Sequence, residues 1–250
     1  FQFVLVVRDE LPEVPGQRLG LFQRLGAEAG FQNGVDVLEL GLPYSDPVMD
    51  GLVIQQATTV ALENGFRISD AFDALAQITA EVDTPALVMT YWNPVLSYGV
   101  ENFARDLKAA GGAGLITPDL IPDEAGEWLS ASDKHELDRV FLAAPTSSPA
   151  RVARACELSR GFVYAVSTMG ITGTRESVDD LAKQVVESVR NASATQNTAV
   201  GIGISSASQV REVNDYADGA IVGSAFIRAY ADGGVDALAT KTAELAKALN

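Results

Sequence analysis

Residues 35–51 read VDVLELGLPYSDPVMDG, and this stretch decides the fold. The apolar run at residues 35–40 has the pattern of a buried strand, and Glu39 stands near its end. The loop that follows is rich in Gly, Pro, Ser and Asp and carries a second carboxylate, Asp50. A strand that ends by directing a carboxylate into a polar loop is typical of the catalytic face of an α/β barrel.

Apolar runs of this kind recur between longer amphipathic segments. Eight are found, at residues 3–7, 35–40, 86–91, 114–117, 139–143, 162–166, 199–204 and 220–222. Most are continuously apolar, as expected for strands that are covered on both faces, and eight parallel strands close a barrel. A doubly wound sheet is the alternative, but it favours a glycine-rich first turn, and residues 8–12 contain no glycine. Because no linker divides the chain, we predict one domain over residues 1–250, a single (β/α)8 TIM barrel.

Composition excludes several classes of function. The formal charge of −15 argues against nucleic-acid binding, which needs clustered Lys and Arg. No apolar run is long enough to span a membrane and no signal peptide is recognisable, so we expect a cytoplasmic protein. Cys156 is the only cysteine and His135 the only histidine. We therefore expect no disulfide and no metal site, and a Ser-His-Asp triad is disfavoured because His135 lies in a polar stretch.

Two glycine-containing turns predict a phosphate site. Residues 201–206 read GIGISS and residues 219–225 read GAIVGSA, and each is a strand that runs into the start of a helix. They follow the seventh and eighth predicted strands, where barrels of this kind bind phosphate through the backbone amides of helix N-termini. The loop within residues 161–174 has two glycines and three threonines; it suits an anion-binding flap and an ordinary connection equally well.

The two carboxylates also have structural interpretations. Glu39 could be paired with a Lys or Arg inside the barrel, and an Asp-Gly pair such as Asp50-Gly51 is most often a turn. Together with the phosphate site, however, they indicate an enzyme that acts on a small phosphorylated molecule. The residues alone do not name that molecule.

Six ordered segments resemble the tryptophan synthase α subunit family, and actinobacterial members in particular. They are residues 39–51, 89–94, 115–119, 164–173, 201–206 and 223–224, and the similarity extends from about residue 35 onward. The resemblance implies a lyase of tryptophan biosynthesis, one of the pathways of aromatic amino-acid biosynthesis. Its reaction would be the retro-aldol cleavage of indole-3-glycerol phosphate to indole and glyceraldehyde 3-phosphate.

The resemblance also implies roles for individual residues. Glu39 would be the acid–base residue that protonates the indole carbon, and Asp50 would accept the indole N–H. Tyr164 would position Glu39. The remaining substrate-binding residues would enclose the indole ring (Met89, Ile116 and Leu142) or hold the phosphate end (Thr172, Gly173, Gly203, Gly223 and Ser224).

A partner follows from the same resemblance. The α subunit would bind a pyridoxal-phosphate β subunit in an α2β2 heterotetramer and would carry no cofactor itself. The loops with Asp46-Pro47 and Asn93-Pro94 would face that partner. Two alternatives remain open, namely a standalone indole-3-glycerol phosphate lyase and a catalytically weak allosteric partner of the β subunit. Residues 7–33 match the family poorly, and its N-terminal helix is expected to be absent.

Overall fold

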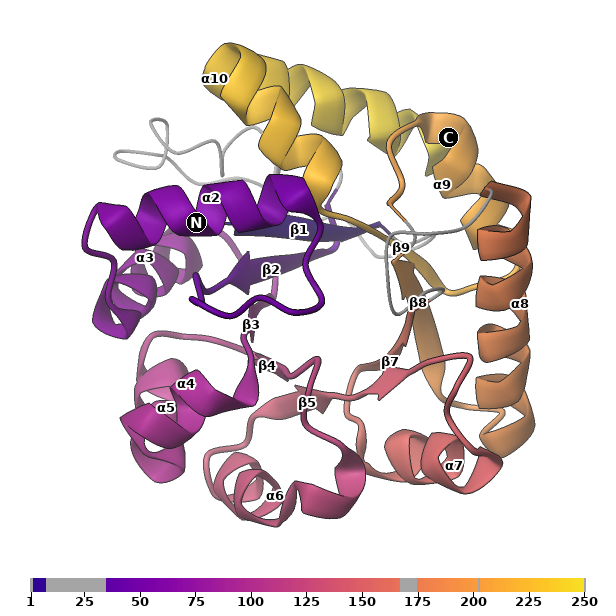
Figure 1. Ribbon diagram of the computed structural model, residues 1–250, viewed down its shortest axis with the longest axis horizontal. Helices are drawn as coiled ribbons and strands as arrows, with labels where there is room; N and C mark the ends of the chain where they lie inside the picture. Colours follow the sequence, from indigo (N-terminus) through magenta and orange to yellow (C-terminus); the bar gives the residue numbers. More distant parts are fainter. Residues whose placement is uncertain (1, 8–34, 167–174, 202, 250) are drawn as a thin grey trace.

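A ring of short strands surrounded by helices forms the body of the molecule (Figure 1). The computed structural model describes residues 2–7, 35–166, 175–201 and 203–249. Its strands are β1 (Gln2–Val7), β2 (Val37–Gly41), β3 (Ala86–Met89), β4 (Gly114–Ile116), β5 (Asp138–Val140), β6 (Leu142–Ala143), β7 (Phe162–Val166), β8 (Asn197–Gly201) and β9 (Gly219–Val222). Its helices are α2 (Leu52–Glu63), α3 (Ile68–Glu81), α4 (Trp92–Tyr98), α5 (Val100–Ala109), η2 (Pro122–Glu124), α6 (Gly126–Lys134), α7 (Pro149–Leu158), α8 (Arg175–Ala192), α9 (Ala207–Asn214), α10 (Ser224–Ala246) and η3 (Lys247–Leu249).

The sheet runs in the order β5-β4-β3-β2-β1-β9-β8-β7-β6, and its two ends belong to one piece of chain. Only Phe141 separates β5 from β6. The N–H of Tyr164 in β7 donates to the carbonyl of Phe141 at 3.0 Å. The backbone of β7 is therefore hydrogen-bonded to the residue that lies between β5 and β6. The strand predicted at residues 139–143 is thus present as two short segments, one pairing with β4 and the other with β7. If β5 and β6 are counted as one strand, the ring contains eight strands, as predicted.

One strand runs against the others. β1 pairs antiparallel with both of its neighbours, with Gln2 opposite Gly41 and Leu5 opposite Val222. The other pairs in the sheet are parallel. The expectation of an all-parallel barrel is therefore wrong for this strand. A continuous apolar run indicates that both faces of a strand are covered, but it carries no information on the direction in which the strand runs.

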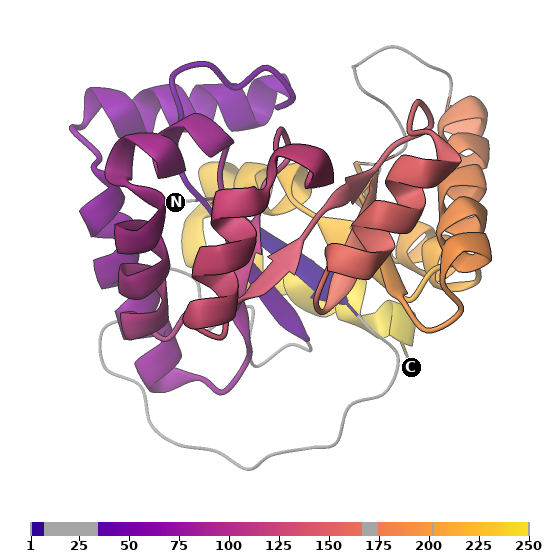
Figure 2. The same cartoon turned by 90° about the horizontal axis from the view of Figure 1, so that it is seen from below.

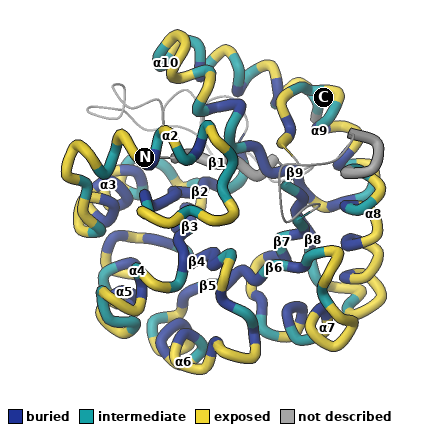
Figure 3. The backbone as a smooth tube through the Cα atoms, in the orientation of Figure 1, coloured by how far each residue is buried: buried dark blue, intermediate teal, exposed yellow. Residues whose placement is uncertain are grey.

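Alternate residues of several strands, such as Ala86 to Met89 of β3, face two different cores. The small interior core of the ring takes one buried residue from each of six strands: Leu87, Ile116, Val140, Phe162, Ala199 and Ile221. The larger core lies between strands and helices and includes Leu38 and Leu40 of β2. In Figure 3 most residues of strands β2 to β9 are buried, while the helices turn exposed faces outward. The two-residue period of a strand thus places Val37, Glu39 and Gly41 together toward the interior.

The helices lie around the ring of strands (Figure 2), and apolar side chains on them are buried in the larger core. Phe72, Leu75 and Ile78 of α3 are buried at helical spacing, as the sequence predicts. Ser148 caps α7 by accepting a hydrogen bond from the N–H of Arg151, with Pro149 in the first turn. None of the helices in the described ranges is long and apolar enough to cross a membrane.

Candidate active site

Glu39 lies inside the ring on β2, in register with Leu87 of β3. Its side chain is 1% exposed, and neither carboxyl oxygen has a hydrogen-bond partner among the described residues. A buried carboxylate without a partner is costly, so the protonated form is favoured. Burial and the nearby charge of Asp50 raise the pKa of Glu39 to about 8. Glu39 therefore holds a proton at neutral pH, and the alternative of a structural pair with Lys or Arg has no support in this geometry.

Asp50 stands at the end of the loop that leaves β2. The loop turns back on itself, with the Asp50 N–H donating to the carbonyl of Pro47 at 3.2 Å and the side-chain amide of Gln55 donating to the Asp50 carbonyl at 2.7 Å. Asp50 is thus a turn residue through its backbone, while its side chain remains available for chemistry. Partial burial raises the pKa of Asp50, and a hydrogen bond from Tyr91 opposes that rise. Because the charge of Asp50 acts on Glu39, the two carboxyls form an ionised base beside a protonated acid.

An apolar layer lies beside the two carboxyls. Ile116 belongs to the interior core, and Met89, Leu142 and Tyr164 pack against it. The parallel register pairs Met89 with Ile116, each the last residue of its strand, and Leu142 of β6 with Tyr164 of β7. The structure therefore brings together Glu39, the three side chains that the resemblance places around the indole ring, and Tyr164, which it assigns to positioning Glu39.

Tyr164 of β7 lies close enough to both carboxyls for their charges to act on its hydroxyl. Burial raises its pKa, and the charges of Glu39 and Asp50 raise it further. The tyrosine fits only because Gly201 of β8 has no side chain. A Cβ at Gly201 would lie 2.5 Å from the Tyr164 hydroxyl oxygen and 3.0 Å from its ring.

The candidate phosphate residues lie where β8 and β9 end. These strands pair in parallel, so Gly203 and Gly223 follow them at the same edge of the ring. Gly203 is exposed with φ of +73°, a conformation that favours glycine, and Gly223 precedes α10, whose first residue is Ser224. The first N–H groups of a helix lack intrahelical partners and suit an anion. Thr172 and Gly173 lie outside the described residues.

Two residues of this site have no role in the sequence prediction. Gly201 was grouped only with the phosphate turn, although it makes room for Tyr164. Tyr91 contacts both Met49 and Asp50 from the end of β3. The signal for Tyr91 was its spacing, because it continues the alternation of Leu87 and Met89, both of which face the interior.

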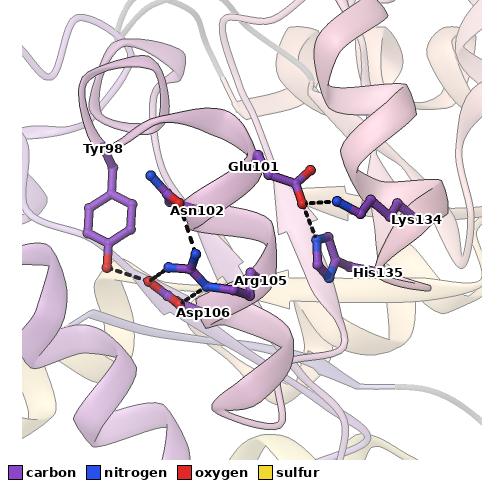
Figure 4. A network of polar contacts seen from close by, with 7 residues as sticks. All are labelled: Tyr98, Glu101, Asn102, Arg105, Asp106, Lys134 and His135. Atoms are coloured by element: carbon purple, nitrogen blue, oxygen red, sulfur yellow. Dashed lines mark hydrogen bonds and ion pairs between the residues drawn. The ribbon is translucent and has the colours of Figure 1, made fainter.

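His135 takes no part in this site. Its Nε2 lies 2.9 Å from Glu101, which also pairs with Lys134, and this network joins α5 to the end of α6 on the surface (Figure 4). Within the described ranges no cluster of three or more His, Cys, Asp or Glu side chains is arranged to hold a metal.

Comparison with known proteins agrees with this geometry. A family model described as "Tryptophan synthase alpha chain" matches residues 27–249. The tryptophan synthase alpha chain of Leifsonia xyli subsp. xyli is 64% identical over 216 residues, which are 86% of this chain and 82% of that one. That of Mycobacterium avium is 55% identical over 215 residues, 86% and 79% of the two chains. A crystal structure of tryptophan synthase from M. tuberculosis in its aminoacrylate-bound form superposes with a TM-score of 0.83 at 47% identity, covering 91% of this chain and 87% of that one. The chain therefore belongs to the tryptophan synthase alpha chain family.

Proposed function

We propose that this chain performs the lyase reaction of its family at Glu39 and Asp50, cleaving indole-3-glycerol phosphate to indole and glyceraldehyde 3-phosphate. One observation carries the proposal. A buried carboxyl with a pKa of about 8, which has no hydrogen-bond partner in the part of the chain that the structure describes, stands beside the charge of Asp50. Such a pair supplies a proton donor and a negative charge a short distance apart, and both border an apolar layer suited to a flat ring.

The reaction begins with protonation of the indole carbon that bears the glycerol chain. Glu39 gives its proton to that carbon, which makes the ring an electron-deficient indolenine cation. Asp50 accepts the indole N–H and offsets the positive charge as it develops. The carboxylate of Glu39 then removes the proton of the neighbouring hydroxyl, the carbon–carbon bond breaks, and its electron pair returns to the ring. The products are indole and an aldehyde, and Glu39 is again protonated.

The phosphate end of the substrate would lie on the amides around Gly203, Gly223 and Ser224. Thr172 and Gly173 complete this set in the proposal. The shared edge of β8 and β9 supports it, because their carboxyl ends face the same side of the ring as Glu39 and Asp50. Backbone amides bind phosphate without a cation, which agrees with a chain of formal charge −15. Met89, Ile116 and Leu142 would enclose the ring, and Tyr164 would line the site and help position Glu39.

The partner would be a β subunit that carries pyridoxal phosphate, in an α2β2 assembly in the cytoplasm. This single-domain chain would then need no cofactor of its own. Support comes from the apolar surface around the loop with Asp46-Pro47. Val48 is 82% exposed and Leu52 is 65% exposed, and Leu96 of α4, next to Asn93-Pro94, is also exposed. Exposed apolar side chains gathered beside an active site are typical of a protein interface.

Indole release from indole-3-glycerol phosphate tests the function directly. We would measure it for the chain alone and with a pyridoxal-phosphate β subunit, using Glu39→Gln as the matched inactive variant. Slow release that the partner accelerates is the expected result. Fast release without the partner would indicate the standalone lyase. No release in either condition, with the partner still activated on binding, would indicate the allosteric role instead.

A further inference from the structure

Tyr91 lies two residues after the end of β3, and contacts with other residues hold it in place. Its side chain is 5% exposed, and its ring stacks on that of Tyr44 with centroids 5.2 Å apart. The hydroxyl of Tyr44 accepts a hydrogen bond from the Asn93 side chain at 3.3 Å. On the other side, the N–H of Trp92 donates to the Asp119 carboxylate at 2.8 Å. The ring of Tyr91 is thus held from one side while the backbone next to it is tied to the following loop.

The hydroxyl of Tyr91 joins two neighbouring residues of the loop after β2. It accepts a hydrogen bond from the Met49 N–H at 2.9 Å. The single hydrogen of this hydroxyl remains available to donate, and the interaction of the hydroxyl with the side chain of Asp50 lowers the pKa of that carboxyl. One atom therefore fixes the loop backbone at Met49 and the side chain of Asp50 across 42 residues of sequence.

We propose that Tyr91 is the positioning residue for Asp50, holding its carboxylate ionised and aimed at the substrate N–H. This inference rests on the proposed function, in which Asp50 accepts that N–H. The other ionisable groups near this pair are Glu39 of β2 and Tyr164 of β7, whose pKa values the charge of Asp50 raises, and Asp119, whose charge raises the pKa of Tyr91. Burial raises the pKa of Asp50, whereas the Tyr91 hydroxyl lowers it and so favours the charged form.

Tyr91→Phe in the full chain with its β partner is the main experiment. The phenyl ring keeps the contact with Tyr44, so only the hydroxyl is lost. A hydrogen bond to a charged group of this kind corresponds to about a tenfold to hundredfold loss of kcat. KM is expected to stay within about twofold, because the phosphate end anchors the substrate. The acid limb of the pH profile moves to higher pH, since the pKa of Asp50 rises when its donor is removed.

Tyr98→Phe is the matched control. Its hydroxyl donates to Asp106 at 2.7 Å in the surface network of Figure 4, so the same chemical change is made to another Tyr–Asp pair. This variant should keep both kcat and the pH profile of the parent chain. An unchanged kcat and acid limb in Tyr91→Phe, or a loss confined to KM, would overturn the proposal.

A second measurement tests the effect of Tyr91 on Asp50 independently of the cleavage reaction. Carbon-13 NMR of the labelled aspartate carboxyls, without substrate, follows the titration of Asp50 in the parent chain and in Tyr91→Phe. A higher pKa of Asp50 in the variant supports the positioning role, and an unchanged pKa overturns it. If the parent chain releases no indole, the proposed function fails, but this titration still decides whether Tyr91 acts on Asp50.

Discussion

Replacing Glu39 by Gln should inactivate the enzyme and stabilise its fold, and the stabilisation should grow with pH. Glutamine has nearly the same shape as a protonated glutamic acid but cannot ionise. The pKa of Glu39 rises from 4.5 to about 8 on folding because its carboxyl is buried without a partner. At about 1.4 kcal/mol per pH unit, ionisation of Glu39 costs the folded state about 5 kcal/mol when complete.

The direction of this pH dependence follows from which state of the chain, folded or unfolded, binds the Glu39 proton more tightly. The folded state keeps it up to about pH 8, whereas the unfolded chain releases it near pH 4.5. Stability of the parent chain therefore falls as pH rises between these two values, and Gln removes this dependence. The difference in unfolding free energy between Glu39→Gln and the parent should be under about 1 kcal/mol at pH 5 and about 3 kcal/mol at pH 7.

Urea unfolding at pH 5, 7 and 8.5 measures this difference, with m compared between the chains to confirm that the same surface unfolds. Glu63→Gln, at an exposed position at the end of α2, serves as the control and should give the same small difference at each pH. A Glu39→Gln difference that stays flat from pH 5 to 8.5 would refute the reasoning. Glu39 would then be ionised in the folded state, and it could not be the proton donor at neutral pH.

Three further substitutions test other parts of the site. Asp50→Asn should lower the cleavage rate by about a hundredfold or more, because its charge opposes the cation of the intermediate, and a parental rate would reduce Asp50 to a turn residue. Gly201→Ala places a Cβ 2.5 Å from the Tyr164 hydroxyl oxygen, so kcat should fall by about tenfold to a hundredfold while thermal unfolding changes little; equal kcat would show that Tyr164 needs no fixed position. Gly223→Asp should raise KM at least about tenfold through repulsion of the phosphate, with kcat within about threefold, and an unchanged KM in steady-state assays would move the phosphate site elsewhere.

The positions of the strands could be predicted because each is a short apolar run between polar segments. The two-residue period then places Glu39 on the same face as Val37, so its interior location follows from sequence as soon as the strand is recognised. The turns at Gly203 and Gly223 were predictable for a similar reason, since glycine beside a strand end marks a change of direction.

Features that depend on contacts between distant segments were not predictable. The direction of β1 is set by its pairing with β2 and β9, and its apolar run would look the same in either direction. The break at Phe141 arises where one strand serves two neighbours. Tyr91 reads as an ordinary aromatic residue until the loop after β2 folds back and brings Met49 to its hydroxyl.

Glu39 and Asp50 have different chemical roles because they occupy different positions in the fold. Glu39 belongs to a strand that borders the apolar interior layer, and none of the described residues donates a hydrogen bond to it. Asp50 belongs to a loop, so a hydroxyl from the next strand can reach it and favour the charged form. Its charge then raises the pKa of Glu39 still further. A proton donor and an anion thus coexist at one pH because one carboxyl stands inside the ring and the other at its rim, and exchanging their surroundings would exchange their roles.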